Sequence, residues 1–163
     1  MKNSNKIDKA LLIVCLCFLL VFNASFIHAE NISGGRSVIE TLNDRWNKAL
    51  NSGKPESVGE LYDQGAILSP GNGEFLVGRV AIEDLFRGFI DNGVHDHSIE
   101  IIGTHQDGNT MYEISKWRAY GREENGKKPV FGGVFVNIFH IDENGKWKSH
   151  LHTWNLSDNT GEQ

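Results

Sequence analysis

The spacing of apolar residues changes after about residue 93, and that change limits the folds open to this chain. From about residue 38 to residue 93, apolar residues recur mostly every three or four positions, as in amphipathic helices, with one hairpin interposed; after residue 93 they follow strand-like patterns. The later segments are separated by the turn dipeptides Asp107-Gly108, Asn125-Gly126 and Asn144-Gly145, which favour tight hairpins. Helices followed by an antiparallel meander indicate an α+β fold with the helices packed on one face of a sheet.

Three helices are expected in the first half of the chain. The first covers about Val38 to Leu50, and a short second helix begins near Pro55, a residue tolerated in a first helical turn. The third is the clearest, because its apolar residues share one face. These residues are Ile82, Leu85, Phe86, Phe89 and Ile90. This face has to cover other apolar residues.

The remaining apolar segments are predicted to be strands. Two short strands flank the turn Pro70-Gly71-Asn72-Gly73, and four longer ones follow the third helix. The longer strands cover about Ser98 to His105, Thr110 to Tyr120, Val130 to Ile141 and Lys146 to Asn155. The pattern therefore predicts six strands in a mostly antiparallel sheet.

Residues 1–29 have the features of a cleavable secretory signal peptide. Lysines precede an apolar run from Ala10 to Phe22, and Ala29 offers a small residue for cleavage. The run has 13 residues, fewer than the roughly 20 of a permanent membrane helix; an uncleaved membrane anchor is the alternative. Cleavage would leave residues 30–163 as a single secreted or periplasmic domain, no longer attached to a membrane.

Cysteine content and charge limit the chemistry that this domain can perform and the partners that it can bind. Both cysteines, Cys15 and Cys17, lie in the apolar run, so residues 30–163 contain no thiol and no disulfide. Removal of residues 1–29 changes the formal net charge from −5 to −7. An acidic surface argues against nucleic acid or anionic lipid as a partner, because both call for basic patches.

The last predicted strand carries a row of polar and aromatic side chains. In the sequence WKSHLHTWN, residues 147–155, His150, His152 and Trp154 alternate and so share one face of a strand. Histidine titrates near neutral pH, which makes both histidines candidates for a general base or a hydrogen bond to a ligand. The alternative is a pair of histidines near a strand end that are solvated or hydrogen-bonded to the backbone.

Three strings resemble the nuclear transport factor 2-like superfamily, and within it the SnoaL-like and ketosteroid isomerase-like proteins. They are RWNKALNSGKPESVGELYDQGAILSPG, GRVAIEDLF and FHIDENGKWKSHLHTWN, and the resemblance covers about residues 36–156. It implies a cone-shaped α+β fold in which a strongly curved sheet wraps against three N-terminal helices around a deep pocket. Such folds serve many functions, so function has to be argued from the pocket.

The ketosteroid isomerases place three polar groups at positions that can be identified here by resemblance. Their general base is an Asp directly before a Pro, where this chain has Ser69. A serine hydroxyl cannot take a proton from carbon unless another base activates it. Their oxyanion hole pairs a Tyr with a protonated Asp, where this chain has Trp46 and Asn137, both neutral N–H donors. The implied pocket can hold a carbonyl or phenol oxygen but lacks the isomerase base.

The resemblance also implies which side chains face the pocket. If Asn137 points inward, then His150, His152 and Trp154 line the pocket; many SnoaL-like relatives carry an Asp in place of His152. Glu113 faces either the pocket, where burial would raise its pKa, or solvent, and both directions are open. Several aromatic residues either line the pocket or belong to the core. They are Trp46, Tyr62, Phe86, Phe89, Trp117, Phe135 and Trp154.

A metal site is not predicted, although the chain has two His-x-His pairs. His95 and His97 lie at the entry to the third strand, and His150 and His152 lie on the sixth, with two other strands between them in the implied sheet. At ~4.8 Å per strand the gap is about 14 Å, too wide for one ion. No cofactor is expected.

Two functions are open at this stage. We expect a secreted, homodimeric domain that binds a small hydrophobic molecule. The alternative is an isomerase, cyclase or dehydratase that transfers a proton on a small carbonyl or hydroxylated compound. In that enzyme His152 or Glu113 would move the proton, while Asn137 and Trp46 would stabilise the oxyanion. The ligand contacts expected in either case are Tyr62, Phe86, Trp117, Phe135, His150 and Trp154.

Overall fold

A computed structural model describes residues 34–157 of the chain. The predicted signal peptide, residues 1–29, lies outside these residues. Between residues 34 and 157, no helix combines the length and the hydropathy needed to cross a membrane. This part of the chain forms three helices and six strands, which confirms the α+β fold expected from the sequence.

The helices lie within a few residues of their predicted positions. Residues 34–51 form the first helix, and α2 (Pro55–Gly59) and α3 (Arg79–Asp91) follow. Shortly after the end of α3, Gly93 has a φ of 82°, a left-handed conformation that glycine adopts without steric cost. The chain can therefore turn sharply from α3 into the sheet.

The six strands form one mixed sheet. They are β1 (Tyr62–Ser69), β2 (Leu76–Val77), β3 (His95–Asp107), β4 (Thr110–Tyr120), β5 (Val130–Ile141) and β6 (Trp147–Trp154). Their order in the sheet is β2-β1-β6-β5-β4-β3. Neighbours run antiparallel, except that β1 and β6 are parallel. The first and last long strands thus lie side by side at one end of the antiparallel meander.

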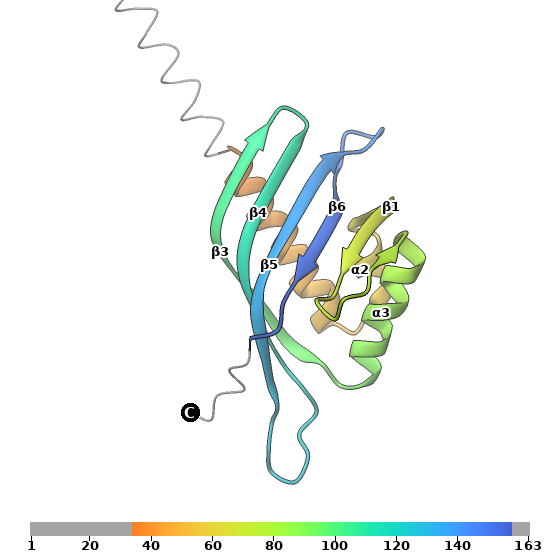
Figure 1. Ribbon diagram of the computed structural model, residues 1–163, viewed down its shortest axis with the longest axis vertical. Helices are drawn as coiled ribbons and strands as arrows, with labels where there is room; N and C mark the ends of the chain where they lie inside the picture. Colours follow the sequence, from red (N-terminus) through yellow and green to blue (C-terminus); the bar gives the residue numbers. More distant parts are fainter. Residues whose placement is uncertain (1–33, 158–163) are drawn as a thin grey trace, which may run out of the picture.

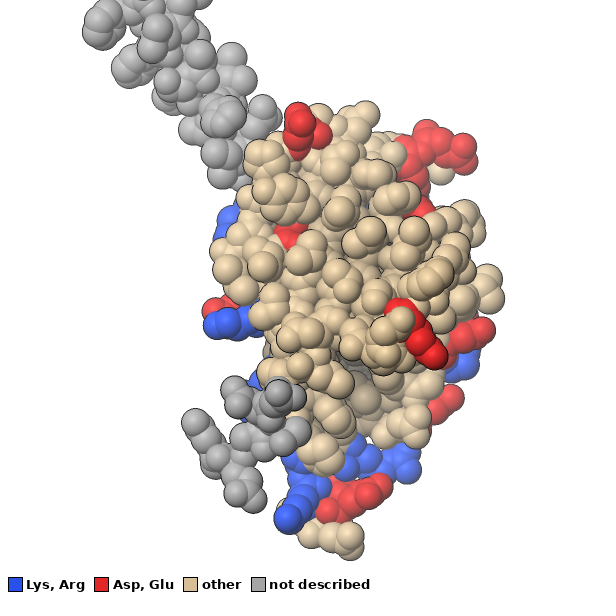
Figure 2. All heavy atoms as spheres, viewed as in Figure 1, with Lys and Arg blue, Asp and Glu red and all other residues tan. Residues whose placement is uncertain are grey.

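The helices cover one face of the sheet. Figure 1 shows the first helix crossing behind β4, β5 and β6, with α2 and α3 beside β1. Figure 2 shows the opposite face, where most charged side chains lie near the edges. Tyr112 and Ile114 alternate with buried residues of β4 and are exposed on this face. The homodimer expected as part of the binding function stays a prediction.

The core lies between the helices and the sheet in two clusters. The larger one joins the first helix, α2, α3 and β1, and its members include the buried Tyr62 and Phe86. The smaller one packs the start of the first helix, through Ile39, against Met111 of β4 and Phe139 of β5. The helix is thereby held at both ends.

A β-bulge in β6 changes the side-chain pattern of the last strand. Ser149 and Leu151 both have partners on β5, whereas His150 has none and is the extra residue. A bulge interrupts the alternation of inward and outward side chains. Ser149 and His152 are buried, and His150 is not. The predicted row of His150, His152 and Trp154 is therefore broken at His150.

Candidate functional site

A cavity of about 370 Å³ lies between the first helix, α3 and the helix-covered face of the sheet. Its aromatic lining consists of Trp46, Phe86, Phe89, Trp117, Phe131, Phe135 and Trp154. Five polar side chains also line it, namely Asn43, Asn72, His97, Asn137 and His152. Apolar walls with a few placed polar groups are the usual composition of a site for a small molecule.

His152 ends a buried chain of hydrogen bonds. The indole N–H of Trp46 donates to the Tyr62 hydroxyl at 3.4 Å, and that hydroxyl lies 2.7 Å from Nδ1 of His152. Tyr62 is fully buried, and within residues 34–157 its hydroxyl has no other acceptor, so it donates its proton to Nδ1. The neutral imidazole therefore carries its own proton on Nε2, the nitrogen left for the cavity.

Burial keeps His152 uncharged. Its ring centroid lies 5.0 Å from that of Phe135 and 5.2 Å from that of Trp154. Desolvation, followed by the charge of nearby His97, lowers the pKa of His152 from 6.5 to about 3. At neutral pH the side chain is a hydrogen-bond donor to the cavity and carries no charge.

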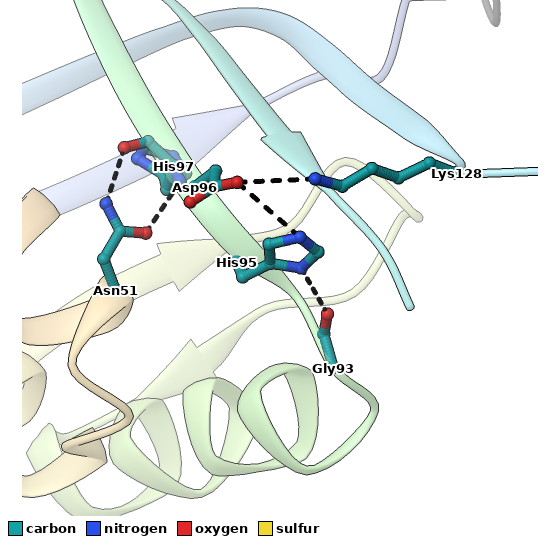
Figure 3. A network of polar contacts seen from close by, with 6 residues as sticks. All are labelled: Asn51, Gly93, His95, Asp96, His97 and Lys128. Atoms are coloured by element: carbon teal, nitrogen blue, oxygen red, sulfur yellow. Dashed lines mark hydrogen bonds and ion pairs between the residues drawn. The ribbon is translucent and has the colours of Figure 1, made fainter. Parts of the chain in front are cut away.

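Two asparagines one turn apart on the first helix hold His97. Asn51 donates from Nδ2 to the His97 carbonyl at 2.9 Å and accepts the His97 N–H at Oδ1 at 2.7 Å (Figure 3). Oδ1 of Asn47 lies 2.7 Å from Nδ1 of His97. An amide oxygen only accepts, so Nδ1 carries the proton and Nε2 presents a lone pair.

The His97 ring lies among aromatic side chains at the cavity wall. Its centroid is 4.5 Å from that of Trp46 and 6.0 Å from that of Trp117, with the latter ring nearly parallel at 9°. Burial lowers the pKa of His97 from 6.5 to about 4. His97, like His152, is therefore neutral at pH 7, but it offers an acceptor where His152 offers a donor.

The sequence did not identify His97 as a ligand contact, because a local irregularity sets its direction. Asp96 has a φ of 50°, and the register between β3 and β4 shifts here. Figure 3 shows His95 turned toward the Gly93 carbonyl, 2.9 Å from its Nδ1, and Asp96 toward Lys128. The only sequence signal was the His-x-His pair at 95 and 97, weighed there for a metal. Among residues 34–157 no cluster of three or more His, Cys, Asp or Glu is arranged to hold an ion.

Asn137 supplies a second donor beside His152. The two residues are paired across β5 and β6. Ser149 donates from Oγ to Oδ1 of Asn137 at 2.6 Å, which occupies the amide oxygen and leaves the amide nitrogen for the cavity. Asn137 faces the cavity, the direction that the resemblance implied.

Glu113 faces inward but does not line the cavity. It is fully buried, and its Oε2 accepts hydrogen bonds from Asn43 at 2.8 Å and Ser115 at 2.7 Å. Burial raises the pKa of Glu113, and these two bonds lower it in part. Its Oε1 is buried without a partner in the described residues. Asn43, and not Glu113, reaches the cavity.

The structure corrects three further expectations about the site. Tyr62 lies behind His152 and does not line the cavity. His150, displaced by the bulge, bonds Asp63 at 2.7 Å and stacks on His140 outside the cavity. Trp46 lines the cavity with its ring, but its N–H points to Tyr62 and is no oxyanion donor. The expected contacts that do line the cavity are Phe86, Trp117, Phe135 and Trp154.

Comparison with known proteins agrees with this architecture. Residues 43–150 match the SnoaL-like domain. The chain belongs to the SnoaL-like domain family. No curated protein matches this SnoaL-like chain, so its function has to be inferred from the cavity.

Several solved structures share the fold of this SnoaL-like domain. A nuclear transport factor 2-like protein with a cystatin-like fold from Novosphingobium aromaticivorans is 19% identical, with a TM-score of 0.66, over 85% of this chain and 89% of that one. A ketosteroid isomerase-like protein from Erwinia carotovora is 17% identical, with a TM-score of 0.63, over 74% and 94%. A conserved protein from Planctomyces limnophilus is 13% identical, with a TM-score of 0.68, over 80% and 98%. Identities this low establish the fold alone.

This SnoaL-like domain uses Ser69, at the position of the isomerase base, to close a turn. The Ser69 hydroxyl donates to the carbonyl of Glu74 at 3.0 Å, across the turn between β1 and β2. Pro70 and Asn72 of that turn line the cavity, whereas Ser69 does not. The hydroxyl is therefore a structural group and is not directed at a bound molecule.

Proposed function

We propose that this SnoaL-like domain binds a small hydrophobic molecule reversibly in the cavity, without chemistry. The observation that carries the proposal is the cavity of about 370 Å³ with aromatic walls from the first helix, α3 and β4 to β6. Its size lies within the range of about 300–1,000 Å³ usual for such sites. Transfer of an apolar ligand from water to these walls is favourable by roughly 25 cal/mol per Å² buried.

The polar groups favour binding over catalysis. Ser69 is occupied in a turn, and Glu113 does not line the cavity. His152 presents an N–H and so cannot accept a proton from a ligand at neutral pH. Fixed donors and acceptors orient a ligand, and Ser69, Glu113 and His152 are not positioned to remove a proton from carbon.

Native mass spectrometry of the purified domain tests the proposal. We expect a co-purifying small molecule, released on denaturation. Val94 lines the cavity, whereas Val80 on α3 is 72% exposed, so Val94→Trp should abolish capture and Val80→Trp should leave it intact. Equal capture by the two variants would show that the ligand binds elsewhere.

A proton-transfer enzyme is the second candidate, and the free lone pair on Nε2 of His97 is the observation that favours it. His97 lines the cavity and this nitrogen is an acceptor, although a pKa of about 4 makes it a weak base. Exchange of the α-protons of 2-tetralone for deuterium in D₂O, followed by NMR, measures the removal of a proton from carbon. If the wild type accelerates this exchange and His97→Phe does not, the domain is an enzyme. Equal exchange rates with and without the wild type favour binding alone.

We also propose that the domain acts outside the cytoplasm after removal of residues 1–29. Support comes from the lysines and the apolar run from Ala10 to Phe22. N-terminal sequencing of exported protein should begin at or near Glu30. A first residue upstream of Cys15 would contradict cleavage.

A further inference from the structure

The polar groups of the cavity define the ligand class more closely, in an inference that rests on the proposed binding function. We propose that the cavity takes an uncharged, flat aromatic molecule with two polar ends. A carbonyl-type oxygen accepts from Asn137 and His152, and a hydroxyl or N–H at the other end donates to His97. The assignment follows from which atom of each side chain is already occupied by the protein.

The donor end of the cavity lies on β5 and β6. Tyr62 donates to Nδ1 of His152, so Nε2 carries the proton. Ser149 occupies the amide oxygen of Asn137, so the amide nitrogen is left. These two side chains are cross-strand neighbours, and two adjacent N–H donors suit one oxygen with two lone pairs.

The acceptor end lies on β3. Oδ1 of Asn47 accepts a hydrogen bond from Nδ1–H of His97, which leaves the lone pair on Nε2. Asn51 clamps the backbone of the same residue with two hydrogen bonds. In the sheet, β4 lies between β3 and β5, so the acceptor and the two donors come from different strands of the cavity wall.

The ligand should be uncharged, because the cavity offers no counter-ion. Among residues 34–157, those that line it include no Asp, Glu, Lys or Arg. An ionised group moved from water into such surroundings loses hydration without a compensating partner. Both lining histidines are neutral, in line with their lowered pKa values.

The walls favour a flat molecule. The rings of Trp46 and Trp117 lie beside His97, and those of Phe135 and Trp154 lie beside His152. Aromatic surfaces pack best against other aromatic rings in offset or edge-on arrangements. A fused aromatic ring system would present its faces to these side chains and its polar groups to the two histidines.

A series of naphthalene probes tests this inference in the wild-type domain. The reference is 6-hydroxy-2-naphthaldehyde, which has both polar ends. Its methyl ether lacks the donor, 2-naphthol lacks the carbonyl, naphthalene lacks both, and 6-hydroxy-2-naphthoate is charged. By calorimetry at neutral pH, the hydroxyaldehyde should bind about tenfold more tightly than the methyl ether, which loses one buried hydrogen bond, and more tightly still than the naphthol, which loses two. The carboxylate should bind more weakly than the aldehyde.

Two variants show which side chain binds each polar end of the ligand. His97→Phe keeps an aromatic ring beside Trp46 but removes the acceptor, so it should bind the hydroxyaldehyde and the methyl ether equally. His152→Phe removes one of the two donors, so it should reduce the preference for the hydroxyaldehyde over the naphthol while keeping that over the methyl ether. His105→Phe is the control, because His105 is an exposed histidine of β3 outside the cavity and should change nothing.

The outcomes separate this inference from the proposed function. Equal wild-type affinities for the hydroxyaldehyde, the methyl ether and the naphthol would overturn the two-ended ligand while leaving a hydrophobic binding site. Tighter binding of the carboxylate than of the aldehyde would overturn the uncharged ligand. Failure of every probe, naphthalene included, to bind the wild type would overturn the binding function itself. The wild-type series gives these answers even if one variant fails to fold.

Discussion

The Tyr62 hydroxyl lies 2.7 Å from Nδ1 of His152, and both residues are buried. This bond joins the hydrophobic core to the cavity, because Tyr62 belongs to the larger core cluster and His152 to the cavity wall. It also decides which nitrogen of the imidazole carries a proton. A structural hydrogen bond thus determines the binding chemistry of the site.

Tyr62→Phe should lower the free energy of unfolding by about 1–3 kcal/mol, because Nδ1 of His152 is left buried without a donor. Urea titration measures the change. Tyr112→Phe is the matched control: Tyr112 is 46% exposed on the outer face, and its hydroxyl should contribute less than about 0.5 kcal/mol. Equal losses in the two variants would mean that the bond to His152 contributes nothing specific.

Acid should destabilise the domain through His97 and His152. Their pKa values are about 4 and about 3 in the folded state, against 6.5 unfolded. The unfolded chain therefore binds protons at higher pH, so stability is complete above 6.5 and is lost as the pH falls toward the folded values. Each histidine should cost about 2 kcal/mol between roughly pH 7 and pH 5. Urea titrations should show a smaller decrease in His97→Phe, and an identical one would contradict the burial of that ring.

Glu113 should change the stability of the domain with pH in the opposite direction to the two histidines. Burial raises its pKa above the ordinary 4.5, so the folded state favours the protonated form. Its contribution is greatest below pH 4.5 and is lost as the pH rises through the raised value. Glu113→Gln keeps an oxygen for Asn43 and Ser115 but cannot ionise. Its stability relative to the wild type should therefore increase from pH 4.5 to neutral pH in urea titrations, and a constant difference would mean that Glu113 has an ordinary pKa.

Periodicity and turn residues predict most of this fold. The apolar face of α3 and the glycine-containing turns locate the helices and hairpins, and the predicted bounds of β4 and β5 equal the observed ones. These features depend on short segments of sequence. The start of β3 was missed because His95, Asp96 and His97 form an irregular segment whose pairing depends on β4.

The site was predictable where strand alternation is regular and not where a bulge interrupts it. Asn137 lines the cavity as expected, since β5 keeps its alternation up to that residue. His150 does not, because an unpaired position in β6 is set by register with β5 and leaves no local mark in the sequence. His97 was missed for a similar reason: its direction depends on contacts with Asn47 and Asn51, about 50 residues away in the chain.

Phe86→Ala should lower the free energy of unfolding by about 3–5 kcal/mol through loss of buried surface and enlargement of the cavity. Phe86 is 2% exposed, and its ring lies 5.1 Å from Trp46 and 6.1 Å from Tyr62 between centroids. Val80→Ala, on the exposed side of the same helix, should cost less than about 0.5 kcal/mol. A loss below about 1 kcal/mol for Phe86→Ala would mean that α3 packs differently.

Asn51→Ala should make His97 less ordered without changing any residue that lines the cavity. The Asn51 side chain pairs with both backbone groups of His97, in the manner of an adjacent strand, and does not line the cavity. Loss of two hydrogen bonds at an exposed site should cost about 1–2 kcal/mol of stability, and a less ordered His97 should reduce the preference for the hydroxyaldehyde over its methyl ether.

Asn51→Asp makes this test specific to the paired geometry. One carboxylate oxygen can still accept the His97 N–H, but the other replaces Nδ2 and faces the His97 carbonyl, so two acceptors oppose each other. At neutral pH this variant should be less stable than Asn51→Ala in urea titrations, and protonation near the ordinary Asp pKa of about 4 should restore part of the loss. Lys48→Ala, an exposed neighbour on the same helix, should match the wild type at both pH values. If Asn51→Asp instead equals the wild type at neutral pH, the two-bond pairing that positions His97 is absent, and the acceptor end of the cavity is not fixed by the first helix.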